Sequence, residues 1–378
     1  RTAVCHAGMM DHALLVERKV IGTTKTVEMA EQPLDENQVR LRIDRFAVTA
    51  NNITYAVFGD MLAYWEFFPT ELPFGQVPAM GWAEVVESNN PDIAVGGRYY
   101  GWFPMASTTV ITATLVSDGF RDDGAHRQPH APVYRSYVDT KRDAMYDAGD
   151  DGEDRHVLLR GLFLTGYLAE EFFADSAAAT DNGEPAYFDA TQVVVLSASS
   201  KTAIGFAQRA AERGVAKVIG LTSAGNADFV RGLGYYDQVV TYDEVVDIDA
   251  SVATVSIDMA GNPTVLGSVH THLGDQLKYS MTVGRSHHDA PDVDAATAAQ
   301  LPGPQPELFF APSEVGRRLE QWGREVYQQR CADALTSFVE GSRAWLSIDH
   351  RTGSDGAAAA WADVHDGNVA PNVGIIAS

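Results

Sequence analysis

The chain has 378 residues, of which 45% are hydrophobic, so it is long enough for about two domains with buried cores. Its formal net charge of −23 at pH 7 makes nucleic acid and anionic membranes unfavourable partners. No run of about 20 apolar residues occurs, so we expect no membrane span. Residues 1–20 lack the apolar core of a signal peptide, and we therefore expect a cytoplasmic protein.

Cysteine and histidine usage argues against a metal site. The two cysteines, Cys5 and Cys331, exclude a disulfide framework and a cysteine-rich zinc site. The eleven histidines include one HTH and one HH sequence, but no Cys or Glu pattern completes a ligand set around them. We therefore expect solvated histidines and no bound metal.

The first half of the chain is rich in strand patterns. Residues 39–49 alternate, with Val39, Leu41 and Ile43 on one face and polar residues on the other. Residues 51–74 are unusually aromatic. Other β-branched or alternating runs occur at 13–18, 24–29, 83–88, 98–103, 108–115 and 129–140.

The sequence TQVVVLSASSKTAIGFAQRAAERGVAKVIG, residues 191–220, carries the most specific pattern. Residues 192–196 form an apolar, β-branched run, which predicts a buried strand. After a polar turn, residues 202–213 show helical spacing and end at Gly214, and 215–221 form a second apolar run. A strand–turn–helix–strand unit of this kind places a helix N-terminus against a dinucleotide pyrophosphate.

The remaining elements follow from simpler patterns. Apolar residues on one side predict a helix at 154–175 before the strand–turn–helix–strand unit. The elements predicted after it are strands at 238–242, 254–257 and 277–283, a Pro-rich loop at 284–306, helices at 313–330 and 331–340, and strands at 344–348 and 374–377.

The sequence SASSKTA, residues 197–203, stands where zinc-independent medium-chain dehydrogenase/reductases of the quinone and enoyl reductase branch carry a GASGGVG-like turn. VRLRIDRFAV, the Asn51–Asn52 pair, PAMGWAEVVE and GGRYYG follow the order of that family's N-terminal domain. The chain resembles a divergent member of this superfamily. The resemblance implies an α/β fold with a GroES-like β-barrel domain, residues 1–178 with 341–378, and a Rossmann-type doubly wound parallel sheet, residues 179–340.

The resemblance also implies an oxidoreductase that uses NADP(H) and no zinc. It would reduce an activated C=C or C=O bond of an apolar or aromatic small molecule, with a proton from tyrosine or water. NADP is favoured over NAD because no Asp or Glu follows the second strand to bind the ribose 2′-hydroxyl. The candidate cofactor-binding residues are Ser197, Ser199, Ser200, Lys201, Thr202, Thr222, Ser223, Asn226, Asp258, Met259, Ala260 and Thr165.

Three residues in the aromatic segment are candidates for catalysis. Tyr55 and Tyr64 follow the Asn51–Asn52 turn, where enoyl reductase relatives place a tyrosine, and either could donate a proton. Asn52 could orient substrate or cofactor, although a role in the turn itself is equally consistent with the sequence. Packing over the barrel is the alternative for both tyrosines.

Two other functions fit the same sequence. The missing glycines leave room for a non-redox lyase or hydrolase with a degenerate cofactor site, and a nucleotide-sensing protein without catalysis is also compatible. In each case the partner is a small molecule, and a homodimer is left open.

Overall fold

The computed structural model describes residues 11–176, 186–259, 261–283 and 301–378. The chain forms two compact units, Arg1–Leu158 with Ile348–Ser378 and Leu159–Ser347, which we call the barrel unit and the sheet unit. The division falls inside helix α3 (Asp150–Ala174), whereas the sequence placed it at residue 178. The second division falls just before residue 348 rather than at 341.

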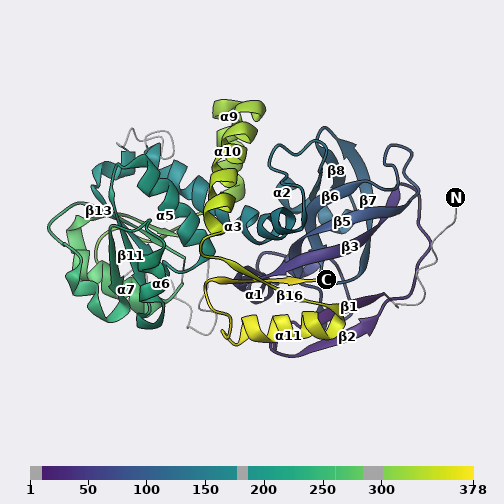
Figure 1. Ribbon diagram of the computed structural model, residues 1–378, viewed down its shortest axis with the longest axis horizontal. Coiled ribbons are helices and arrows are strands. Elements are labelled where there is room, and N and C mark those ends of the chain that lie inside the picture. Colours follow the sequence, from purple (N-terminus) through teal and green to yellow (C-terminus); the bar gives the residue numbers. More distant parts are fainter. Residues whose placement is uncertain (1–10, 177–185, 260, 284–300) are drawn as a thin grey trace. The chain divides into compact units, whose positions relative to one another are not determined.

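A closed antiparallel β-barrel is the main feature of the barrel unit (Figure 1). The barrel closes because β7 pairs back onto β3. On β3, Val39, Leu41 and Ile43 are buried as the alternation predicts. The six strands, in sheet order, are β3 Gln38–Val48, β5 Pro78–Ser88, β6 Arg98–Pro104, β9 Ser136–Asp139, β8 Gly119–Asp122 and β7 Thr108–Val116. β17 (Val373–Ala377) and β16 (Ser347–Arg351) extend the sheet beyond β3.

A smaller antiparallel sheet of β2 (Thr24–Glu28), β1 (His12–Glu17) and β4 (Phe74–Gly75) completes the barrel unit. Helix α11 (Gly353–His365) lies along β1 and β2 (Figure 1). The indole of Trp361 anchors it by donating to the Ile21 carbonyl at 2.8 Å. The sequence did not predict this helix.

The sheet unit holds one wholly parallel sheet, and its strand order confirms the predicted Rossmann-type fold. With the strands numbered along the chain, the order is 3-2-1-4-5-6, the doubly wound arrangement of dinucleotide-binding proteins. The strands, in sheet order, are β12 Gln238–Thr241, β11 Lys217–Thr222, β10 Gln192–Leu196, β13 Thr254–Asp258, β14 Leu277–Thr282 and β15 Glu307–Leu308.

Helices cover both faces of this sheet. α5 (Lys201–Arg213) contacts β10 and β11, as the strand–turn–helix–strand unit predicts. On the other face, α7 (Pro263–Leu273) contributes Val265, Leu266, Val269 and Leu273 to a core that also contains Leu196 and Leu221.

Two sequence predictions near the C-terminus are wrong. The helices α9 (Ala311–Trp322) and α10 (Arg324–Ser342) separate at Gly323, not at residue 330. Gly323 has φ 76°, a left-handed conformation that ends a helix at little cost for glycine. The strand predicted at 344–348 instead begins at Ser347, because the turn after α10 extends to residue 345.

A group of charged side chains holds the first turn of α3 on the barrel. Arg98 on β6 makes bidentate ion pairs with Asp44 at 2.9 Å and with Glu153 at 2.6 and 2.8 Å. The indole of Trp82 donates to the Glu153 carbonyl at 3.1 Å. Burial opposes the charge of Glu153, but hydrogen bonds from Arg98 and Tyr146 hold its pKa below the ordinary value.

We predict that Arg98→Ala lowers the free energy of unfolding by about 3 kcal/mol, the low end for removing one partner of a buried pair, because the buried Glu153 keeps only the Tyr146 hydrogen bond and the Arg45 guanidinium at 3.8 Å. Urea unfolding at pH 7 measures this difference. Arg42→Ala is the matched control: Arg42 makes an exposed pair with Glu84 at 2.8 Å and should cost about 0–1 kcal/mol. Equal losses for the two variants would contradict the account.

The stabilisation of the folded state by Glu153 decreases at low pH. Because its folded-state pKa is depressed, the stabilisation is present above the ordinary value of 4.5 and is lost as the pH falls through the folded value. The difference between the wild type and Arg98→Ala should therefore shrink in urea titrations carried out below pH 4.5.

Candidate functional site

The turn after β10 keeps the shape of a nucleotide-binding turn without its glycines. Ser197 has φ 57°, in the left-handed region that glycine normally occupies. The Ser200 amide donates to the Ser197 carbonyl at 2.9 Å, and the Ser200 side chain caps α5 by accepting from the Ala203 amide at 3.2 Å. The helix N-terminus therefore forms with serine at both positions.

Side chains from distant segments fix this turn in place. Asn226 donates from Nδ2 to Ser199 Oγ at 3.1 Å, and the Tyr236 hydroxyl donates to the Ala198 carbonyl at 2.8 Å. The Tyr242 hydroxyl is hydrogen-bonded to Ser197. Three predicted cofactor residues, Ser197, Ser199 and Asn226, thus belong to one hydrogen-bonded group.

The turn lies at the point where the strand order reverses. β10 lies between β11 and β13 in the sheet. Leu196 at the carboxyl end of β10 pairs with Asp258 at the carboxyl end of β13. Ligands of open α/β sheets bind in the crevice at this edge. Asp258 is buried and accepts from the Gly261 amide at 3.1 Å. Met259 is also buried, and Ala260 lies outside the described residues.

Lys201 is the first residue of α5, followed by Thr202. Its side chain is half-buried, and loss of hydration lowers the pKa of the ammonium group to about 8. At pH 7 the group is still mainly charged. A cation at the N-terminus of a helix suits an anionic ligand, which both the helix dipole and the ammonium group would attract.

The segment after β11 offers polar groups but no carboxylate. Thr222 is fully buried, and its Oγ1 has no hydrogen-bond partner within the part of the chain that the structure describes. Ser223 precedes a short 3-10 helix, Ala224–Asn226. An unsatisfied hydroxyl of this kind is costly unless a ligand or water binds it.

Thr165 lies on α3 and is engaged within that helix. Its hydroxyl donates to the Gly161 carbonyl at 2.9 Å. A Cβ at the next residue, Gly166, would lie 2.5 Å from the Thr202 carbonyl, so the two helix backbones are in close contact. Thr165 is therefore near the start of α5, within the sheet unit.

A cluster of aromatic residues forms the second candidate site, in the barrel unit. It contains Tyr55 on α1 (Ala50–Val57), Tyr64 and Tyr134. The rings of Tyr55 and Tyr64 have centroids 4.6 Å apart, and the hydroxyls of Tyr64 and Tyr134 are 3.5 Å apart. Trp102 donates from Nε1 to the Tyr55 hydroxyl at 3.3 Å.

Burial raises the pKa of the Tyr55, Tyr64 and Tyr134 hydroxyls above the ordinary value. The phenols are therefore neutral at physiological pH and can donate hydrogen bonds. This geometry suits polarisation of a carbonyl oxygen and delivery of a proton.

Asn52 is committed to the barrel. Its Oδ1 accepts from the Thr49 amide at 2.7 Å, and its Nδ2 donates to the Pro78 carbonyl at 2.9 Å. These contacts cap α1 and tie it to β5, which is the turn role that the sequence left as an alternative.

Sequence reasoning did not select Tyr134, Tyr236 or Tyr242. Tyr236 and Tyr242 lie on either side of β12, a strand of four residues. The presence of tyrosine near both ends of so short a strand is the sequence feature that could have indicated them.

Among the described residues, no group of three or more His, Cys, Asp or Glu side chains is placed to hold a metal ion. Within the same part of the chain, no helix has the length and apolar character needed to cross a membrane.

Comparison with known proteins identifies the family. A family model described as "Protein of unknown function (DUF2855)" matches residues 46–370. The chain belongs to this family. No curated protein matches the sequence.

Solved structures share the fold at low sequence identity. CurA from Vibrio vulnificus in complex with NADPH has a TM-score of 0.60 at 14% identity, covering 97% of this chain and 98% of that one. The Etr1p/NADP/crotonyl-CoA complex scores 0.59 at 12%, covering 98% and 100%. The CurF ER cyclopropanase from the curacin A biosynthetic pathway scores 0.61 at 13%, covering 98% and 99%. The predicted medium-chain dehydrogenase/reductase resemblance is thus confirmed at the level of the fold.

We predict that the cluster phenols resist ionisation in the folded protein. The pKa values of these tyrosines are higher in the folded protein than the ordinary tyrosine value of 10.0. The protein therefore keeps its stability below pH 10.0 and loses it as the pH rises above that value, because the unfolded chain ionises first. In an ultraviolet titration, Tyr55→Phe should leave the signal near pH 10 unchanged and reduce only the late step that accompanies alkaline unfolding. A smaller signal near pH 10 in this variant would contradict the account.

Proposed function

We propose that this chain is an NADP(H)-dependent reductase of an activated C=C or C=O bond in an apolar or aromatic small molecule. The observation that carries the proposal is the turn at Ser197–Lys201: it is left-handed at its first residue, capped by Ser200, and located where the strand order of a 3-2-1-4-5-6 sheet reverses. Solved structures with this fold include complexes with NADPH and with NADP.

The residues of the crevice are chemically suited to a dinucleotide. The amides at the start of α5 and the Lys201 ammonium group would hold the phosphates. The buried hydroxyl of Thr222, together with Ser223, would serve the adenosine ribose. Because no carboxylate follows β11, a 2′-phosphate is tolerated there, which favours NADP over NAD. The cofactor, when bound, supplies the hydride.

The tyrosine cluster would supply the proton. We assign Tyr64 as the donor to the substrate oxygen: its hydroxyl lies 3.5 Å from that of Tyr134, which can hydrogen-bond to it, and water returns the proton after the reaction. Tyr55 is the alternative donor; its hydroxyl already accepts from Trp102. The surrounding rings favour an apolar substrate, and no step needs zinc.

A second candidate is a nucleotide sensor, or a non-redox lyase or hydrolase on the same fold. It is favoured by the absence of glycine in the turn and by the hydrogen bonds that Ser197 and Ser199 make within the protein. A sensor would bind NADPH without oxidising it in the presence of quinones or enones. A lyase or hydrolase with a degenerate site would not bind NADPH.

We predict that Tyr64→Phe lowers kcat for NADPH oxidation, with an enone or quinone found by screening, about 100-fold, the lower range for loss of a general acid. The affinity for NADPH should not change. Tyr55→Phe is the matched comparison and should reduce kcat less. Full activity in both variants would remove the tyrosine cluster from the mechanism.

The pKa of Lys201 gives a second test. NADPH binding, followed by calorimetry, should weaken as the pH rises from 7 to 9, because the ammonium group loses its proton near pH 8. Lys201→Arg should bind with little dependence on pH over this range. Lys201→Ala should bind more weakly by about 1–3 kcal/mol at pH 7, the order expected for one charged hydrogen bond.

Titration of the nucleotide itself affects the wild type and both variants equally, so the comparison isolates residue 201. If the wild type and Lys201→Ala show parallel affinities from pH 7 to 9, the phosphates do not contact Lys201.

A further inference from the structure

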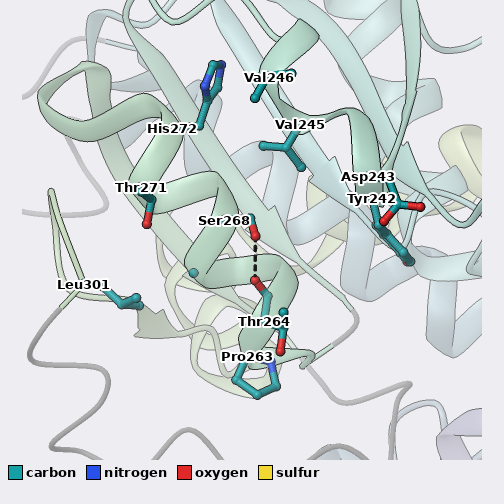
Figure 2. Close-up of a pocket in the computed structure, with 11 residues that line it drawn as sticks. Tyr242, Asp243, Val245, Val246, Pro263, Thr264, Ser268, Thr271, His272 and Leu301 are labelled. Carbon is teal, nitrogen blue, oxygen red and sulfur yellow. Dashed lines mark hydrogen bonds between the residues drawn. The ribbon is translucent and has the colours of Figure 1, made fainter.

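Two buried basic side chains of the barrel unit, Arg127 and His130, have nitrogen atoms without hydrogen-bond partners among the described residues. A hollow of ≈ 760 Å³ beside α7 in the sheet unit differs in this respect (Figure 2). Its lining includes one basic side chain within the described part of the chain, His272, which donates to the Ile248 carbonyl at 2.7 Å. Burial of a basic group with unmet hydrogen bonds is costly, so Arg127 and His130 need a role that offsets the cost.

His130 holds the backbone just before Tyr64. Its Nε2 lies 3.0 Å from the Ala63 carbonyl. A carbonyl oxygen can only accept, so Nε2 carries the ring proton and donates it. Ala63 has φ 57°, a left-handed conformation that is unfavourable for a residue with a Cβ. The hydrogen bond from His130 therefore stabilises a strained backbone at the residue from which the Tyr64 segment starts.

His130 is held in this single protonation state. Its Nδ1 is buried and has no hydrogen-bond partner in the described part of the chain. Burial lowers the pKa of the imidazole, and the charge of Arg127 lowers it further. A proton on Nδ1 would be buried without an acceptor, so the neutral ring with its proton on Nε2 is favoured at neutral pH.

Arg127 holds the second tyrosine of the pair. Its Nη2 donates to the carbonyl of Tyr134 on the short helix α2 (Pro132–Arg135). Nε is 3.4 Å from Oδ2 of Asp122, but neither Nε nor Nη1 has a hydrogen-bond partner among the described residues. The guanidinium carbon lies 4.0 Å from the ring centroid of Phe67. Within the part of the chain that the structure describes, the hydrogen bond that this side chain makes is thus the one that fixes Tyr134.

The ring of Phe67 joins the two basic side chains to the two phenols. Its centroid is 4.5 Å from that of His130. It is also 5.5 Å from the ring centroids of both Tyr64 and Tyr134. Phe67 is buried, and in a close-packed interior the movement of one ring displaces the rings that it contacts.

We propose that His130 and Arg127 are positioning residues for the tyrosine cluster. His130 fixes the backbone ahead of Tyr64 and Arg127 fixes the backbone of Tyr134. Together these two anchors hold the phenol hydroxyls 3.5 Å apart. Both act through the tyrosines rather than on the substrate. The inference rests on the proposed function, in which Tyr64 is the proton donor.

Nuclear magnetic resonance of the full chain, with tyrosine isotope-labelled at the ring Cζ carbon, reports on these hydroxyls directly. Tyr64→Phe and Tyr134→Phe assign the two resonances. His130→Phe keeps an aromatic ring against Phe67 but removes the N–H, and it should shift or broaden the Tyr64 resonance. His130→Gln keeps an N–H donor and should restore the wild-type resonance.

The second anchor has its own variant and a matched control. Arg127→Met removes the guanidinium group and should shift or broaden the Tyr134 resonance. In the control, Gln128→Ala, both tyrosine resonances should be unchanged. Gln128 lies between the two anchors in sequence, but it is exposed and donates to the Asp123 carbonyl at 3.1 Å. Circular dichroism checks that each variant is folded.

Activity gives a second measurement, with cinnamaldehyde, an apolar aromatic enal, as the probe. His130→Phe should lower kcat for NADPH oxidation about 10-fold, less than loss of the phenol itself, because the phenol is present but displaced. KM should be nearly unchanged. His130→Gln should recover most of kcat.

The outcomes separate this inference from the proposed function. It is overturned if the Tyr64 resonance is unchanged in His130→Phe or equally altered in His130→Gln, or if the Tyr134 resonance is unchanged in Arg127→Met. An altered Tyr64 resonance in His130→Phe with kcat unchanged also overturns it. Resonances that change as expected, in a wild type that oxidises NADPH with neither cinnamaldehyde nor any enone or quinone of the screen, support the two anchors and remove the reductase proposal.

Discussion

The left-handed backbone at Ser197 is the constraint on which the candidate nucleotide crevice depends. A residue with a Cβ pays about 1–2 kcal/mol for this conformation, which glycine adopts freely. The local hydrogen bonds of the turn, and those from Asn226, Tyr236 and Tyr242, offset this cost. The turn therefore forms without glycine, and side chains from elsewhere in the sheet unit stabilise it.

Serine in place of glycine in the turn changes how the crevice can bind an anion. Glycines would let phosphate approach the backbone directly, whereas here the serine hydroxyls are already hydrogen-bonded within the protein. The groups at this turn that suit a phosphate are the amides at the start of α5 and the Lys201 ammonium group. Because the protein carries a net charge of −23, attraction of a nucleotide would rely on these short-range groups rather than on the overall field.

The sequence predicted the parts of the fold that have a strong local signal. β10 matches its predicted range because five consecutive apolar or buried positions precede a polar turn. β15 was missed because it has two exposed residues and no pattern. α11 was missed even though its alanines favour a helix, because its polar and small residues give little periodicity. The break between α9 and α10 depends on the backbone conformation of Gly323.

The candidate site also has residues that the local sequence indicates and residues that only the fold brings together. The residues of the turn are contiguous, so Ser197, Ser199, Ser200 and Lys201 could be selected from the resemblance. Tyr242 and Tyr236 could not, because their proximity to the turn follows from the order of β12, β11 and β10 in the sheet. Likewise, the hydroxyl contact between Tyr64 and Tyr134 joins residues that are far apart in sequence.

The central claim is that the crevice beside Ser197 and Lys201 binds NADP(H). Hydrogen–deuterium exchange of the full chain with and without NADPH tests it most directly. The account predicts slower exchange in peptides that cover residues 197–204 and 222–226, with little change in α9. Unchanged exchange in both segments at saturating NADPH, or protection confined to other parts of the chain, would contradict it.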